Sequence, residues 1–197
     1  TTIYEAAFSA NGVFARVDIL HQGPDGWEIY EVKSSTRPKP VYLQDVAVQS
    51  WILRQAGLTV SKTALVTLNP RYRRQGEIKV DELFAIHDLT DESNAMQAFV
   101  SAEVARMQAM LEAGPMPEVA IGHHCNSPYR CAFHSHCHGA QPDDSVFKLT
   151  DIGQPDSYAL FHAGQTRYAE IDLDQLGWRQ RLQVESYLHK TNSVQKV

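Results

Sequence analysis

The chain has 197 residues, of which 43% are hydrophobic and 21% are charged, so it can bury one substantial hydrophobic core. No apolar run approaches the ~20 residues that a membrane-spanning helix needs, and no secretory h-region is present, so we expect a soluble, cytoplasmic protein with no membrane partner. The chain starts at Thr1, without a methionine and directly in a strand-like run. We therefore expect it to be a piece of a longer protein.

The net charge of −5 argues against a nucleic-acid partner, but its distribution argues for one. Residues 1–80 carry ten Lys or Arg against seven Asp or Glu, a balance of +3, whereas residues 81–197 carry −8. Arg71, Arg73 and Arg74 follow a predicted strand and form the kind of cluster that neutralises phosphates, although a merely solvated loop has the same composition. We expect contacts with nucleic acid in the basic half.

Three predicted strands open the chain and are separated by short turns. Residues 2–8, 13–20 and 27–33 are rich in apolar residues, with turn signals at Asn11-Gly12 and at residues 21–26 between them. This pattern predicts a three-stranded antiparallel meander that ends at Lys33.

The end of this meander brings two acids and a lysine together. Side chains alternate along a strand, so Glu31 and Lys33 share one face, and pairing across the hairpin can bring Asp18 beside them. Two carboxylates held close repel each other unless a cation lies between them, and Mg²⁺ or Mn²⁺ suits such oxygen ligands. Lys33 can then orient or deprotonate a water molecule, or stabilise charge on a phosphate. The pattern predicts phosphodiester hydrolysis, although a solvated cross-strand ion pair gives the same residues.

A helix that Gly57 ends is predicted to follow this strand. Tyr42, Asp45 and Gln49 recur at helical spacing and form a polar stripe, which starts a few residues beyond Lys33 and would face the same site. The other sides of the helix are apolar, with Val41, Val46, Val48, Ile52 and Leu53.

These motifs together resemble the PD-(D/E)XK nuclease superfamily, specifically its RecB-like exonuclease branch, in which an Asp, a Glu-x-Lys strand and a helix carrying Gln form the active centre. The resemblance implies an α/β fold with a restriction-endonuclease-like core. It also implies that Asp18, Glu31 and the backbone carbonyl of Val32 bind the metal, that Lys33 is the catalytic lysine, and that Gln49 is the motif glutamine.

The implied activity is metal-dependent cleavage of DNA, as an exonuclease on single-stranded or end-bearing DNA. The branch often places a tyrosine four residues after its glutamine, whereas this chain has Leu53 there. Tyr42 on the same stripe could supply the DNA contact instead.

The elements beyond the helix complete the expected core. A buried strand at 59–68 should pair in parallel with the meander through a right-handed crossover, and residues 78–87 should be extended. A long amphipathic helix is predicted over 92–113, with Phe99, Val100, Val104, Met107 and Leu111 in the core.

All three cysteines, Cys125, Cys131 and Cys137, lie in one segment after a Gly-Pro-rich break. An odd number of cysteines in a cytosolic protein disfavours disulfides and favours a metal. Three thiolates could bind zinc with one histidine as the fourth ligand, or could ligate a four-iron, four-sulfur (4Fe-4S) cluster. The candidate histidines are His123, His124, His134, His136 and His138.

The resemblance favours the cluster in the full-length protein, with zinc as the alternative. Iron-sulfur members of this branch carry one cysteine before the nuclease motifs and three after them, and the trio here resembles the later three. The fourth ligand would then lie upstream of Thr1, unless a histidine serves.

We expect three regions: a nuclease core over 1–113, a cysteine-rich segment over 114–140, and a helical appendage over 141–197. Within the appendage we expect a strand at 145–149 and helices at 156–163 and 174–190. Its layout resembles the linker of bacterial proteins in which a RecB-like domain precedes a ribonuclease-H-like exonuclease domain, so a second nuclease domain is an expected partner.

Two other functions are compatible with the sequence. One is a catalytically inactive DNA-binding module that keeps the fold and a structural metal. The other is a zinc-stabilised RNA-processing or interaction domain.

Overall fold

The computed structural model describes residues 1–190, which fall into two compact units. The first unit comprises residues 1–117, and the second begins at Glu118. The last seven residues of the predicted appendage lie outside the described part of the chain. Among the described helices, none is both long and apolar enough to cross a membrane.

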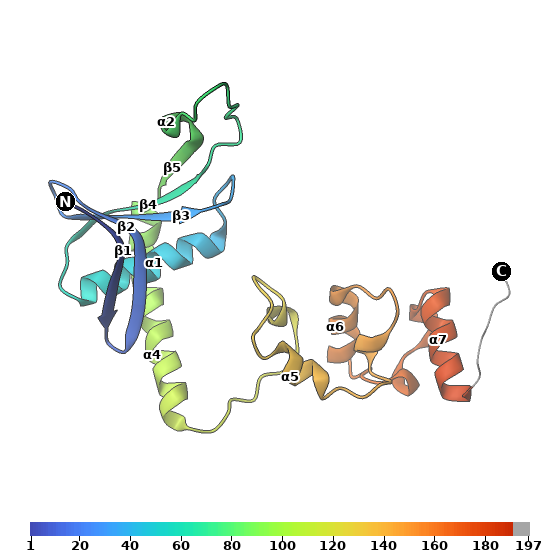
Figure 1. The fold of residues 1–197 in the computed structure, drawn as a ribbon. Coiled ribbons are helices and arrows are strands. Elements are labelled where there is room, and N and C mark those ends of the chain that lie inside the picture. Colours follow the sequence, from blue (N-terminus) through green and yellow to red (C-terminus); the bar gives the residue numbers. More distant parts are fainter. Residues whose placement is uncertain (191–197) are drawn as a thin grey trace. The chain divides into compact units, whose positions relative to one another are not determined.

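The first unit is an α/β structure built on one mixed sheet of five strands in the order β1-β2-β3-β4-β5 (Figure 1). β1, β2 and β3 pair antiparallel, which confirms the predicted meander, and β3 pairs in parallel with β4, as the predicted crossover requires. β5 pairs antiparallel with β4 at the sheet edge. The strands span Thr2–Ala10, Val13–Gln22, Trp27–Lys33, Val60–Leu68 and Phe84–Asp88.

Helix α1 (Pro40–Gln55) connects β3 to β4 and lies along one face of the sheet (Figure 1). Pro40 suits the first helical turn, where a backbone N–H has no helical acceptor. The helix ends at the predicted glycine: Gly57 has a φ of +88°, and its N–H donates to the carbonyl of Arg54. This conformation is costly for residues with a Cβ, so the glycine defines the exit toward β4.

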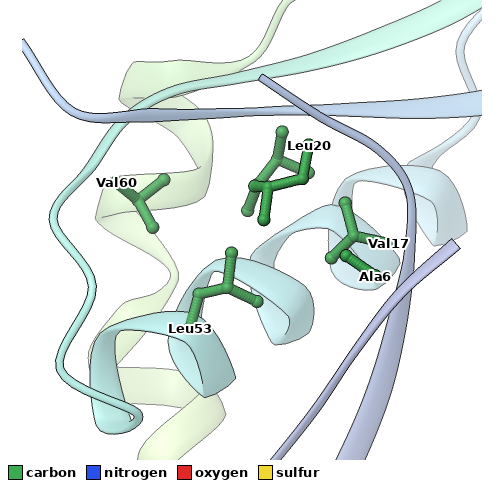
Figure 2. Close-up of a cluster of buried hydrophobic side chains, with 6 residues drawn as sticks. Ala6, Val17, Leu20, Leu53 and Val60 are labelled. Carbon is green, nitrogen blue, oxygen red and sulfur yellow. The ribbon is translucent and has the colours of Figure 1, made fainter. Parts of the chain in front are cut away.

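The core between α1 and the sheet is aliphatic. Figure 2 shows Leu53 of α1 pointing toward Leu20 of β2, with Ala6 and Val17, which are paired across β1 and β2, on one side and Val60 on the other. All of these side chains are buried. The packing fixes α1 against the strands that carry the candidate site.

The segment before and within the predicted long helix departs from expectation. Residues 78–87 are only partly extended, because a helical turn, α2 (Val80–Leu83), precedes β5. The predicted helix over 92–113 is two helices, α3 (Thr90–Ala95) and α4 (Gln97–Ala113). Asp88 accepts hydrogen bonds from the backbone and hydroxyl of Thr90, which starts α3 two residues earlier than expected.

The predicted core face of α4 is only partly correct. Val100 and Val104 are buried against α1, but Phe99, Met107 and Leu111 are exposed, with Leu111 reaching 74%. One narrow side of α4 meets α1, and periodicity alone could not show which of its apolar residues that side would cover.

The second unit is made of short helices. These are η1 (His123–Cys125), α5 (His134–Gly139), η2 (Val146–Lys148), α6 (Gln154–His162), η3 (Tyr168–Glu170), η4 (Leu173–Gln175) and α7 (Trp178–His189). The helix expected at 156–163 is confirmed as α6, and the one at 174–190 begins only at α7. The strand expected at 145–149 is wrong, because the Ser145 hydroxyl accepts from the N–H of Phe147 and caps η2.

The cysteine segment shares a core with the residues that follow it. Ile121, Cys125 and Tyr158 are buried together, with Phe147 and Phe161 packed against them. Residues 118–140 of the predicted cysteine-rich region thus share a compact unit with the predicted appendage, whereas residues 114–117 belong to the first unit.

Two Leu→Ala substitutions in helices test this packing. Leu53→Ala in α1 should reduce the free energy of unfolding by about 2–5 kcal/mol, because it leaves a cavity in the core. Leu111→Ala in α4 is the matched control and should change it by less than about 0.5 kcal/mol. Urea unfolding measures both, and equal losses would show that the core is placed wrongly.

Candidate active site

Glu31 and Lys33 lie on the face of β3 that α1 covers. Parallel pairing places them beside Leu65 and Thr67 of β4, which are fully buried on the same face. Glu31 is itself only 5% exposed. Val32 lies on the other face, as alternation predicts.

Asp18 lies at an irregularity where β1 and β2 both bend. The buried positions of β2 change their spacing here, from Val17 directly to Leu20, and the opposite residue Glu5 has a φ of +55°. Pairing between β2 and β3 stops next to Asp18, whose Oδ2 accepts the backbone N–H of Val32 at 2.8 Å. The carboxylate of Asp18 thus reaches the backbone near the end of β3.

The polar stripe of α1 meets the strand as predicted, and Glu31 accepts hydrogen bonds from both the helix and its own strand. Gln49 Nε2 donates to Glu31 Oε2 at 2.8 Å, and Lys33 Nζ donates to Glu31 Oε1 at 2.5 Å. Lys33 Nζ also donates to Asp45 Oδ2 at 2.7 Å. The sequence predicted that Asp45 faces the site as part of the polar stripe, but it assigned no role to this residue. Its position one helical turn before Gln49 was the available signal.

The charges of this network shift two pKa values. Burial raises the pKa of Glu31, and the negative charges of Asp45 and Asp18 add to the rise, while hydrogen bonds from Gln49 and Lys33 oppose it. Burial lowers the pKa of Lys33, but its hydrogen bonds to Asp45 and Glu31 outweigh this effect and raise the pKa overall. Lys33 is thus held as a cation between two carboxylates.

The oxygen atoms at this site have the chemistry that a hard divalent cation needs. Asp18 accepts from the backbone N–H of Val32, next to Glu31, and its negative charge contributes to the raised pKa of Glu31. Gln49 Oε1 is buried with no hydrogen-bond partner. The amide of Gln49 cannot be reversed, because its nitrogen faces two carboxylates. In residues 1–190, no three acids, histidines or cysteines gather as a ligand set. Two carboxylates completed by backbone and water oxygens nevertheless suit Mg²⁺.

The residues predicted to contact DNA lie in two places. The ring of Tyr42 is 5.6 Å from Lys33 Nζ and 5.5 Å from Lys39 Nζ, so this tyrosine lies at the site. Arg71, Arg73 and Arg74 lie in the loop that leaves β4 at the edge where Lys33 ends β3.

The arginine loop is held by its own backbone. Arg73 donates to the carbonyls of Pro70 and Tyr72, and Arg74 donates to that of Gly76. Arg71 and Arg73 line a hollow of about 430 Å³. Within the described residues, no ion pair links these arginines to the carboxylates of the site.

The three cysteines share a region without forming a ligand set in the described part of the second unit. Cys125 is buried, Cys137 packs against its cluster, and the N–H of Cys131 donates to the carbonyl of Cys125 at 2.9 Å. His138 Nε2 is buried without a hydrogen-bond partner. An iron-sulfur cluster or zinc at these thiols stays a prediction.

Comparison with known proteins adds little to this geometry. No family model matches the chain, and no curated protein matches it. A solved structure described as the crystal structure of SSO0001 is similar over 59% of this chain and 53% of that one, with 14% identity and a TM-score of 0.30. The chain thus spans about half the length of that protein, and a similarity this low supports no conclusion about function.

The raised pKa of Glu31 predicts how stability depends on pH. The folded chain binds this proton more tightly than the unfolded chain, whose carboxyl has a pKa of about 4.5. The stabilisation is therefore complete below that value and is lost as the pH rises through the folded pKa. Glu31→Gln lacks this loss, so its stability relative to the wild type should increase from pH 4 to pH 8.

Urea unfolding in metal-free buffer at both pH values measures the difference. Glu77→Gln, which removes an exposed carboxylate from the same unit, is the control for loss of one surface charge. If the free energy of unfolding of Glu31→Gln differs from that of the wild type by the same amount at both pH values, the assignment of Glu31 as a desolvated acid is contradicted.

Proposed function

We propose that this chain is a divalent-metal-dependent nuclease that hydrolyses phosphodiester bonds in DNA. The observation that carries the proposal is that one buried carboxylate accepts hydrogen bonds at both of its oxygens. Lys33 lies on the same strand as Glu31 and donates to one of its oxygens. Gln49 lies eighteen residues after Glu31, on α1, and donates to the other oxygen. These are the residues that the RecB-like nuclease pattern assigns to its active centre.

A solvated ion pair explains this arrangement poorly. Surface pairs contribute little to stability and need no buried acid, whereas Glu31 is desolvated and its pKa is raised. Burying charges of this kind commonly costs stability relative to apolar packing, so such networks are often found at functional sites.

The residues divide the chemistry between them. Asp18 and Glu31, with the backbone carbonyl of Val32, would hold Mg²⁺ or Mn²⁺, and the bound ion would supply positive charge at the scissile phosphate. The ammonium of Lys33, whose side chain is 25% exposed, would orient the attacking water or stabilise charge that develops on the phosphate. Gln49 would fix the orientation of Glu31.

The fold and surface charge agree with this proposal. A meander followed by a crossover helix and a parallel strand is the arrangement expected for a restriction-endonuclease-like core. Tyr42 at the site, and Arg71, Arg73 and Arg74 at the same edge of the sheet, would contact single-stranded or end-bearing DNA.

The test is cleavage of end-labelled single-stranded DNA with and without MgCl₂. Lys33→Ala should lower the cleavage rate by about 10²–10³-fold while DNA binding is retained, because it removes a charge that acts in the transition state. Lys62→Ala is the matched control: this lysine lies 5.5 Å from the ring of Tyr30, apart from the carboxylate network, and the change should leave cleavage intact.

Cleavage by Lys33→Ala at the wild-type rate would refute the proposed role of Lys33. A wild-type chain that binds DNA but does not cleave it would favour the inactive DNA-binding module. Cleavage of RNA in preference to DNA would favour an RNA-processing domain.

A further inference from the structure

Asp45 is the residue that joins the helix side of the candidate site to its strand side. Its Oδ2 accepts from Lys33 Nζ at 2.7 Å, and its Oδ1 faces Gln49 Nε2 at 3.4 Å. Among the described side chains, Glu31 is the other residue that accepts hydrogen bonds from both Lys33 and Gln49. Asp45 therefore contacts, from the helix, the same two residues that Glu31 contacts from the strand.

This second set of hydrogen bonds matters because Glu31 would have to bind two cations, the ammonium of Lys33 and the metal ion. One of its oxygens accepts from Lys33, although the proposed function makes the same carboxylate a metal ligand. A divalent ion and an ammonium compete for such a group, since each neutralises its charge. Without another partner, Lys33 would be free to leave the site whenever the ion is bound.

Asp45 is placed to prevent this loss. Its side chain is 42% exposed, so it lies at the open side of the network, away from buried Glu31. Tyr42 lies one turn earlier on the same helix, with its ring 5.6 Å from Lys33 Nζ. Glu31, Asp45 and Tyr42 thus surround the ammonium from a strand and a helix, and two of these contacts do not depend on Glu31.

We propose that Asp45 is a positioning residue that holds the ammonium of Lys33 at the site while Glu31 ligates a metal. This inference rests on the proposed function, which it deepens. A role for Asp45 as a further metal ligand is less well supported. Residues 1–190 contain no group of three acids placed to hold one ion, as Asp18, Glu31 and Asp45 would have to be if all three were ligands.

The experiment measures how fast Lys33 is acylated at one fixed pH, by mass spectrometry, with and without MgCl₂ and without DNA. With MgCl₂, Lys33 should react about fivefold faster or more in Asp45→Asn than in the wild type, because neither carboxylate charge then holds the ammonium. Without MgCl₂ the increase should be smaller, since Glu31 still accepts from Lys33. Lys62 is the internal reference, and Asp91→Asn, an exposed acid of α3, is the matched control.

Equal acylation of Lys33 in Asp45→Asn and the wild type with MgCl₂ would overturn the inference. So would a loss of Mn²⁺ affinity in Asp45→Asn by calorimetry, since that result would make Asp45 a ligand. Asp45→Ser, a smaller neutral residue, repeats the measurement if Asp45→Asn folds poorly. These readouts need no turnover, so a failure of the wild type to cleave DNA identifies a failure of the proposed function instead.

Discussion

The structure of the candidate site depends on the burial of one carboxylate. Glu31 lies between β3 and α1, where water cannot solvate it, so its charge must be compensated by the chain. Lys33 and Gln49 provide that compensation, and each can do so only if the strand and the helix keep their relative position. The aliphatic packing of Leu20 and Leu53 maintains this position (Figure 2). The hydrophobic core and the polar network therefore specify the same arrangement of α1 on the sheet.

The order of the elements explains why these groups meet at one edge. A crossover from β3 to a parallel β4 carries the chain back over the sheet, and α1 is that connection. Its first turns thus lie close to the end of β3, where Lys33 is the last strand residue. The loop that follows β4 leaves from the same edge, because parallel strands end together. Arg71 is therefore brought to this edge by topology and not by proximity in the sequence.

Much of this could be predicted because the signals are local. Alternation fixed the face of Glu31 and Lys33, and Gly57 marked the end of α1. Other features depended on packing that a single sequence does not encode. Leu111 has the right periodicity for a core residue, but no element of the first unit, as described, covers it. Asp45 was visible on the polar stripe, yet its contact with Lys33 depends on how deeply the helix lies against the strand. The positions of the cysteines relative to one another could not be predicted either, since their spacing does not determine the path of the loops between them.

The hydrogen bond between Asp18 and Val32 couples two properties that are usually treated separately. The carboxylate completes the ladder of β3 where pairing with β2 has stopped, so the same oxygen that could face an ion also secures the strand terminus. Asp18→Ala would loosen the backbone and remove a proposed ligand at once, so it would confound the two losses. Asparagine keeps an acceptor for the Val32 amide and removes only the negative charge, so it is the substitution that separates affinity for an ion from local order.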